Sequence, residues 1–451
     1  MRWKAGFAKG GPLLGVALSA SLLILTPLSA QDSSVVRSQG PDSALKLTFS
    51  FNAGMGGLTF VRSLYVNSAD PDSGGKDNWI EAWVKPGVLA ELPLARGVAY
   101  GTVSVVGEGT YAAPPALVGP ETSSFNLEDL AVGWRSGVED GRKRDLVDFS
   151  IGRSQYRLGK GFLLFDGAGE GGTRGGYWSN ARRAWALAAV GRFAPGRHLV
   201  EGFYLDRSEV PENDTKSKVW GVNYEFAPDA ANLFGATYLS VQADPGVRPT
   251  RDGLQVLDLR AFVAPFRGLP GLAAELEYAH QQNGEVAKST AWSAKGGYTF
   301  SGIGWKPTLS YRYAYFQGDD PVTAVNEGWD QLFVGFTDWG TWFQGEIAGG
   351  YFLGNSNLIS HQARIDVVPA GNFSSGVIGY LFQFDQPQSF APSVTSKDVA
   401  LEIDWYGDLK ISRHISASAV AAYGDPRKAV EQFAGRTHNF VYGLVYFWYR
   451  Y

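Results

Sequence analysis

A glycine-rich segment over residues 159–184, GKGFLLFDGAGEGGTRGGYWSNARRA, gathers side chains that could bind a sugar. Its cationic and aromatic members are Arg174, Tyr177, Trp178, Arg182 and Arg183. A guanidinium can hold a carboxylate through two parallel hydrogen bonds, and an aromatic ring can stack on an apolar face. These residue types indicate contact with an acidic or neutral sugar. Two interpretations stay open: the segment folds into a pore as a constriction, or it is a solvated external loop.

The same segment carries Gly167, Gly169 and Gly171, a spacing that superficially suggests a phosphate-binding loop. Such loops point backbone amides at phosphate from the junction between a strand and a helix. No helical periodicity follows these glycines, so the sequence argues against a phosphate site.

A second candidate site lies in residues 318–356. Asp319, Asp320 and Asp338 could ligate calcium, which takes several oxygen ligands, but a solvated acidic loop is the favoured interpretation. The large aromatic residues of this segment are Trp329, Trp339, Trp342 and Phe343. Rings of this size are costly to leave in water, so they should pack over a barrel mouth, plug it, or offer a surface for carbohydrate. Packing is the favoured interpretation.

Residues suited to catalysis are scattered. The five histidines are His198, His280, His361, His414 and His438. No Gly-x-Ser-x-Gly or His-x-x-x-His pattern occurs, and adjacent Ser360 and His361 would point to opposite faces of a strand. The sequence therefore predicts no enzymatic activity, no catalytic residue, no metal site and no cofactor.

The elements that must position these loops show a period of two. Within residues 399–406, the apolar set Val399, Leu401, Ile403 and Trp405 alternates with Ala400, Glu402, Asp404 and Tyr406. Charges fall repeatedly on the second face, as a wet interior permits and a packed core would not. After residue 30 no run of 18 apolar residues offers a transmembrane helix, although 14% of the chain is aromatic. The pattern predicts an all-β protein, an up-and-down antiparallel barrel that spans a membrane.

The number of strands follows from their parity. The predicted strands lie near 45–56, 79–92, 97–110, 124–137, 145–158, 182–194, 197–208, 217–227, 232–243, 253–264, 271–281, 288–300, 306–317, 357–368, 374–384, 397–407, 414–424 and 439–451. Residues 338–352 also alternate, but counting them gives an odd number and reverses the alternation of short and long connections. Bacterial barrels have even strand numbers. We therefore expect eighteen strands, with sixteen as the alternative, in one barrel domain over residues 45–451.

Alternation places many charged side chains on the lumen face. They are Glu81, Lys85, Asp129, Arg135, Asp258, Arg260, Glu275, Glu277, Arg312, Arg364, Asp366, Glu402 and Asp404. Each alone is best explained as a solvated or paired wall residue, whereas together they predict a polar lumen of mixed sign. The predicted pore-lining or solute-contact residues are Arg174, Tyr177, Trp178, Arg182, Arg183, Asp258, Arg260, Arg312, Arg364 and Glu402. The facing of Arg153 is ambiguous, and Gly152 could mark a bulge that resets it.

Both ends of the chain carry export signals. Residues 1–30 combine early basic residues, an apolar stretch and a final Ala30, which predicts a secretory signal peptide followed by a polar leader over 31–44. The C-terminal FVYGLVYFWYRY alternates up to Tyr451 and resembles the signal that the barrel-assembly machinery recognises. A soluble edge strand is the alternative, but so exposed an aromatic strand would invite aggregation.

The net charge of −4 argues against nucleic acid as a partner, and the absence of cysteine excludes disulfides and thiol chemistry.

Four stretches resemble the alginate-export-type outer-membrane proteins. They are GRSQYRLGKGFLLFDG (152–167), RGGYWSNARRA (174–184), SYRYAYFQGDDP (310–321) and DWGTWFQGEIAGGYFLGNSNLISHQARI (338–365). The resemblance covers roughly residues 124–451 and implies a monomeric eighteen-stranded barrel that conducts a polysaccharide or smaller solute. The alginate exporter has a strongly basic conduit, whereas this chain is net acidic, which argues against alginate itself as the solute.

The expected function is therefore a channel in the outer membrane of a Gram-negative bacterium, porin-like or for sugar or polysaccharide export. It would pass polar or anionic solutes through a water-filled lumen. Its expected partners are outer-membrane lipid and lipopolysaccharide, the barrel-assembly machinery and the solute. The alternatives are an adhesive or structural barrel closed by its loops, and an outer-membrane hydrolase.

Overall fold

Strands make up most of the chain that the structure describes. The computed structural model describes residues 45–62, 76–115, 121–137, 145–168, 174–179, 181–211, 214–264, 266, 268–335, 337–338, 341–342, 345–350, 353–435 and 438–451. The predicted signal peptide (1–30) and leader (31–44) lie outside these residues.

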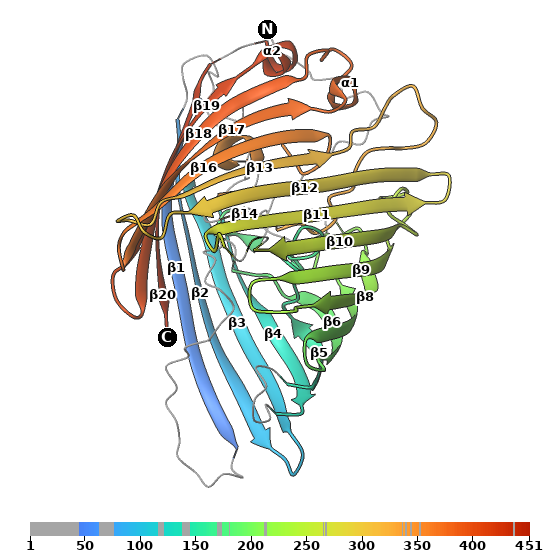
Figure 1. The fold of residues 1–451 in the computed structure, drawn as a ribbon, viewed down its shortest axis with the longest axis vertical. Helices are drawn as coiled ribbons and strands as arrows, with labels where there is room; N and C mark the ends of the chain where they lie inside the picture. The colour runs from blue at the N-terminus through green and yellow to red at the C-terminus, as the bar shows by residue number, and fades with distance from the viewer. Residues whose placement is uncertain are drawn as a thin grey trace.

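One sheet contains eighteen strands (Figure 1). Their bounds are β1 Lys46–Val61, β2 Lys76–Pro93, β3 Val98–Ala113, β4 Thr122–Arg135, β5 Val147–Ser154, β6 Trp185–Phe193, β7 His198–Asp206, β8 Lys218–Phe226, β9 Leu233–Gln242, β10 Gln255–Val263, β11 Leu272–Asn283, β12 Ala287–Thr299, β13 Thr308–Phe316, β16 Leu358–Ala370, β17 Phe373–Phe384, β18 Asp398–Lys410, β19 Ile415–Pro426 and β20 Phe440–Arg450. The prediction of eighteen strands is confirmed, and each lies close to its predicted range.

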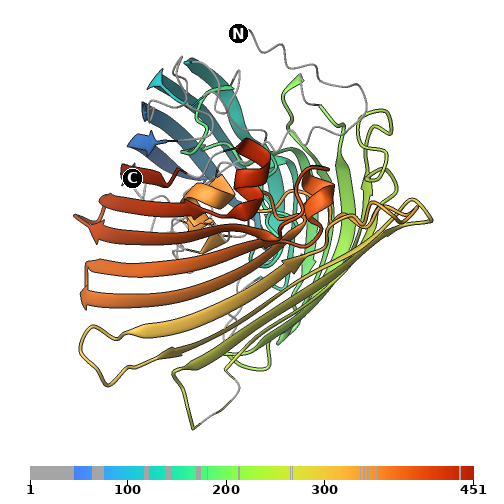
Figure 2. The same ribbon diagram turned by 90° about the horizontal axis from the view of Figure 1, so that it is seen from above.

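The sheet closes on itself. Every strand is antiparallel to its neighbour along the chain, with β13 paired to β16, and the last strand β20 pairs with β1 from Asn52↔Arg450 to Val61↔Val441. Figure 2 shows the strands curving round a common interior. Because every strand has two neighbours, no edge is left to pair with another chain. The predicted barrel is therefore confirmed.

The alternating segment 338–352 contributes no wall strand, as the parity argument required. Its strands β14 (Thr337–Asp338) and β15 (Thr341–Trp342) pair only with each other, and a π-helical turn follows at Gly345–Gly349. Two short α-helices, α1 (Pro387–Phe390) and α2 (Lys428–Ala434), lie in other connections. Within the described part of the chain, no helix is long and apolar enough to cross a membrane.

The two faces of the wall differ as the alternation predicted. On β18, Leu401, Ile403 and Trp405 are exposed on the outer face, whereas Glu402 and Asp404 are buried on the lumen face. An apolar outer face suits lipid, where a Lys or Arg at mid-bilayer costs roughly 2–4 kcal/mol. The wall thus presents apolar side chains to hydrocarbon and keeps its charges inside.

Strand length divides the barrel into unequal parts. Strands β1 to β4 have 14 to 18 residues, whereas β5 to β10 have 8 to 10. In Figure 1 the long strands reach well past the short ones at the end where β2 connects to β3.

Two register shifts affect charged residues of the lumen side. On β4 the register with β3 shifts between Leu127 and Asp129, which leaves Glu128 as an inserted and fully buried residue. Between β5 and β6 the register shifts from Gly152 to Ser154, so that two residues of β6 lie opposite the single residue Arg153, which stays paired with Leu130 of β4. The irregularity expected at Gly152 is therefore present, with a φ of +136° that suits glycine, but the extra residue belongs to β6.

Candidate functional site

Two connections between wall strands have their described residues inside the barrel (Figure 2). We call them the first inward loop, residues 155–184 between β5 and β6, and the second inward loop, residues 317–357 between β13 and β16. Backbone N–H groups of both loops donate to carboxylates on the lumen face of the wall. The structure therefore favours the constriction interpretation of residues 159–184 over a solvated loop.

The first inward loop is held on β2 by Glu81. Oε2 of this carboxylate accepts the N–H groups of Trp178 and Ser179, both at 2.7 Å, and the Ser179 hydroxyl at 3.1 Å. Its Oε1 accepts the indole N–H of Trp79 at 3.0 Å. Glu81 has no exposed surface, so these donors replace the water that a buried carboxylate would otherwise lose.

The next two strands hold the residues that follow. Glu108 of β3 accepts the Ala181 N–H at 3.3 Å and is ion-paired to the buried Arg182. Oε1 of Glu128, the bulge residue of β4, accepts the N–H groups of Arg183 at 2.7 Å and Ala184 at 2.9 Å. The loop thus crosses β2, β3 and β4 in order, with one carboxylate on each strand.

The second inward loop is held on β18. Glu402 accepts the Ile347 N–H at 2.7 Å through Oε1 and the Ala348 N–H at 2.8 Å through Oε2, and Asp404 accepts the Glu346 N–H at 3.1 Å. Gly345 opens this turn with φ +85°, and a Cβ there would lie 2.5 Å from Glu402 Oε1. Only glycine therefore lets the backbone approach the carboxylate this closely.

The opposite end of the second loop is held by an ion pair. Asp330 accepts two hydrogen bonds from Arg251, in the connection between β9 and β10, at 2.7 and 2.6 Å. Burial raises the pKa of Asp330, but the charge and hydrogen bonds of Arg251 outweigh burial and bring the pKa below its ordinary value. A bidentate pair of this kind fixes orientation as well as distance.

The two inward loops also contact each other. The N–H of Phe165 donates to the carbonyl oxygen of Phe333 at 2.9 Å, and the N–H of Gly335 donates to that of Gly161 at 3.0 Å. Phe162 stacks on Phe316 of β13 with ring centroids 5.7 Å apart. The loops and the wall therefore share one apolar core inside the barrel, which limits the passage left for solute.

The predicted cations of the first loop have protein partners. Arg174 donates to the carbonyl oxygens of Ser208 at 3.0 Å and Glu209 at 2.6 Å. Arg182 is buried against Glu108, and the Arg183 guanidinium lies 4.9 Å from the Phe165 ring centre. All three fix the loop in this conformation, and their contact with solute stays a prediction.

The predicted stacking residues are packed inside. Tyr177 and Trp178 are 6% and 5% exposed and meet edge to face with centroids 4.8 Å apart. A ring that stacks on a passing sugar needs an open face. In this conformation the two rings pack the loop against the wall.

The predicted wall pair Arg260 and Asp258 is also buried. On β10, Arg260 donates to Asp258 at 2.6 Å, and its guanidinium lies 3.1 Å from Glu225 of β8. The sequence predicts that Asp258 and Glu402 oppose the arginines across an open lumen, but the structure gives both of them other partners. Asp258 is Arg260's own ion-pair partner, and Glu402 holds the second loop.

Arg312 and Arg364 lie on neighbouring strands of one wall. Arg364 of β16 donates to Asp366 at 2.7 Å and to the Tyr406 hydroxyl at 2.8 Å. Arg312 of β13 lies opposite Lys295 of β12 in the ladder. Lys295 in turn lies opposite Glu275 of β11. The structure therefore gathers basic residues on the wall from β10 to β16, each with acidic neighbours.

Two partly exposed charged side chains of the lumen were not predicted from the sequence. The Arg192 side chain on β6 is 39% exposed and lies 3.5 Å from Asp148, and the Lys160 side chain in the first loop is 41% exposed and lies 2.6 Å from Glu275. Alternation along β6 places Arg192 on the same face as Ala188 and Val190 and could have found it. Lys160 carries no comparable signal, because a loop has no fixed period.

The acidic residues of the second loop are used locally. Asp319 accepts the Glu327 N–H at 2.8 Å, and Asp320 accepts the Val322 N–H at 3.0 Å. The side chain of Asp338 lies outside the described residues, as do Trp339, Trp342 and Phe343 among the aromatic residues. Trp329 is buried, as the packing interpretation predicts. Among the side chains that the structure describes, no group of three or more His, Cys, Asp or Glu is placed to hold a metal ion.

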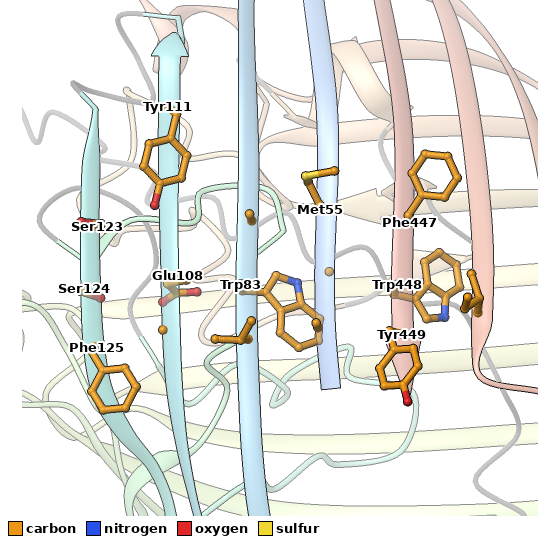
Figure 3. A pocket seen from close by; sticks show the side chains of 16 residues that line it. Met55, Trp83, Glu108, Tyr111, Ser123, Ser124, Phe125, Phe447, Trp448 and Tyr449 are labelled. Carbon is orange, nitrogen blue, oxygen red and sulfur yellow. The ribbon is translucent and has the colours of Figure 1, made fainter. Parts of the chain in front are cut away.

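A groove of about 580 Å³ lies on the wall formed by β20, β1, β2, β3 and β4 (Figure 3). The exposed residues Met55, Phe125 and Phe447 and the half-buried Tyr449 of the outer face line it, with Ala82 and Gly107 between them. Because these side chains face outwards, this hollow belongs to the lipid-facing surface and not to the pore.

The family comparison bears on the middle of the chain. A model of the alginate export family matches residues 215–387, which run from β8 to β17 and include the second inward loop. The resemblance to alginate-export-type barrels is thereby confirmed for this part of the chain. A search among curated proteins found no match.

Several solved structures share this fold. The structure of Pseudomonas aeruginosa OccK7 (OpdD) matches with a TM-score of 0.54 and 10% identity over 91% of this chain and 99% of that chain. Acinetobacter baumannii OccAB2 matches with a TM-score of 0.55 and 11% identity over 89% and 98% of the two chains. Outer membrane protein OprD from P. aeruginosa matches with a TM-score of 0.53 and 11% identity over 89% and 93%. At this identity the likeness shows the fold.

The closed barrel with its apolar outer face has the fold of an outer-membrane barrel, and the alginate-export match over residues 215–387 agrees with the expected class.

Proposed function

We propose that this barrel passes small polar or anionic solutes, such as sugars or sugar acids, through a lumen narrowed by the two inward loops. The observation that carries the proposal is the position of both loops, which are bound to lumen-facing carboxylates inside a closed barrel. A wide barrel selects only when something narrows it, and here the narrowing element is built from the chain itself.

Charge preference would come from the wall between β10 and β16. Arg312 and Arg364 lie there with Lys295, and carboxylates such as Glu275 and Asp366 lie beside them. A solute carboxylate passing this wall would meet the partly exposed guanidinium of Arg364, which can form paired hydrogen bonds, whereas Arg312 is buried and would act through its charge. The mixed sign of the wall favours moderate anion preference over the tight binding of a polyanion.

Planar bilayers containing the purified barrel test this function directly. We expect discrete conductance steps and, in a salt gradient, a reversal potential that indicates anion preference. Arg312→Ala and Arg364→Ala should each shift that potential towards cation preference. Unchanged selectivity in both variants would contradict the assignment of these arginines.

A barrel closed by its loops is the second candidate, because the loops and the wall share a buried core. Such a protein would serve adhesion or structure and would show no conductance steps in the same bilayers.

We also propose the partners and the oligomeric state. Lipid and lipopolysaccharide would surround the outer face, the assembly machinery would bind the Tyr451 strand, and the barrel would be a monomer. No catalytic role is proposed.

A further inference from the structure

The inward loops are held mainly through their backbone, by carboxylates that the wall presents to them. Glu81, Glu128 and Glu402 together accept six backbone N–H groups from the loops. All three carboxylates are at most 1% exposed. A buried carboxylate needs donors, and a loop inside a barrel has free N–H groups, so each satisfies the other.

We propose that Glu81, Glu108, Glu128 and Glu402 are positioning residues that set the size limit of the channel by fixing the two loops. This proposal rests on the channel function and goes beyond it, because it assigns solute size to residues that touch no solute. The carboxylates act through the loop backbone, and the loops do the narrowing.

The pairing of strands explains why three of these acids work together. Glu108 lies opposite Trp83 of β2, two residues from Glu81 on the same face, and Glu128 lies on the strand beyond. The loop residues follow in the same order, with 178 and 179 on β2, 181 and 182 on β3, and 183 and 184 on β4. The loop therefore advances by about two residues from one strand to the next, a step that an extended chain can make across neighbouring strands.

Release of the first inward loop from the wall should also weaken the packing of the second inward loop. A Cβ on Gly350 of the second loop would lie 3.1 Å from the Trp178 ring, so the two loops touch at this position. Trp178 is also the residue whose N–H donates to Glu81. Release of the first loop from β2 therefore removes a contact from the second.

Substitution of glutamine for glutamate should affect Glu81 and Glu128 differently, because their carboxylate oxygens accept different sets of hydrogen bonds. Both oxygens of Glu81 accept hydrogen bonds, so the amide of Glu81→Gln must direct its NH2 group at a donor in either orientation. Only Oε1 of Glu128 accepts the loop N–H groups. Glu128→Gln can keep its oxygen in that place, and the loop should stay bound.

The first measurement reports loop release without any need for conduction. The chain has no cysteine, so Ser179→Cys introduces a single thiol at a buried position of the first loop, and because the Ser179 hydroxyl itself donates to Glu81, all labelling rates are compared with that of Ser179→Cys alone. We expect slow maleimide labelling in this background, at least about tenfold faster labelling with Glu81→Gln, and little change with Glu128→Gln. Glu91→Gln is the matched control, because Glu91 is a lumen-facing acid of β2 whose ion pairs are with Lys46 and Arg135.

The second measurement reports pore size. Liposomes containing each variant are mixed with a monosaccharide, a disaccharide or a trisaccharide, and swelling is followed. We expect Glu81→Gln to admit a larger sugar than the wild type, with about a twofold rise in single-channel conductance and unchanged heat-modifiable migration of the folded barrel.

The outcomes separate the two proposals. Equal labelling in Glu81→Gln, Glu128→Gln and Glu91→Gln would overturn the positioning role, even in a working channel. Faster labelling without a change in sugar size would overturn the claim that these acids set the size limit. A wild type that never conducts would overturn the channel, while the labelling rates would still decide whether the carboxylates hold the loop.

Discussion

The acidic side chains of β2, β3, β4 and β18 and the basic side chains of β10 to β16 face the same lumen but do different work. The acids are buried and bind loop backbone, as Glu81 and Glu402 show. The bases pair with acids of the wall itself, as Arg260 does with Asp258 and Arg364 does with Asp366. One side of the barrel therefore shapes the passage, and the other side gives it charge. Lumen-facing charges alone do not show which role a residue has.

Among the variants that test this division of roles, Arg260→Ala should have the largest effect. The guanidinium and Asp258 are both fully buried in the ion pair, so removing Arg260 leaves an unpaired buried carboxylate. We expect a loss of about 3–5 kcal/mol of unfolding free energy. Denaturant unfolding in detergent or lipid measures it. A loss under about 1 kcal/mol would mean that Arg260 is not part of the structural framework of its wall.

Glu402→Ala should have the next largest effect. It leaves the N–H groups of Ile347 and Ala348 without their acceptor, at a cost of about 1–3 kcal/mol each. We expect the second loop to leave β18 and the single-channel conductance to rise. Asp408→Ala is the control on the same strand and face, because Asp408 accepts the Ser418 hydroxyl. An equal rise in both variants would place the effect in the wall and not in the loop.

Arg364→Gln should change selectivity with little effect on stability. The pair with Asp366 is partly exposed, at 10% and 27% for the two side chains, and such pairs contribute about 0–1 kcal/mol. We expect a reversal potential shifted towards cations, with the wild-type conductance and unfolding midpoint retained. A marked fall in the midpoint would show that Arg364, like Arg260, belongs to the structural framework of the basic wall.

The smallest effect should come from pH at the second loop. The lowered pKa of Asp330 means that its pair with Arg251 stabilises the loop above the ordinary aspartate pKa. That contribution is lost as pH falls through the lowered value, so conductance should rise in acid below about pH 4. Asp330→Asn should weaken this acid response. A full response in Asp330→Asn would assign it to other carboxyl groups.

The wall could be predicted from the sequence because its signal is local. Alternation put Glu81, Glu402 and Asp404 on the lumen face, and parity excluded 338–352 from the wall. The partners of those acids could not be predicted, because loop N–H groups carry no mark in the sequence. Glu128 was missed for a further reason. Strict alternation cannot place both Glu128 and Asp129 inside, and only the bulge on β4 allows it.

The unequal strand lengths give the protein a slanted rim. The 18 residues of β2 extend to about 60 Å, or about 42 Å after a tilt near 45°, whereas the apolar belt of such barrels is about 25 Å tall. By the same measure, strands of 8 to 10 residues reach only about 19–23 Å, just under the height of that belt. The β2–β3 end of strands β1 to β4 therefore stands clear of the bilayer as a one-sided screen, and large molecules reach the mouth at that end more easily from the low side.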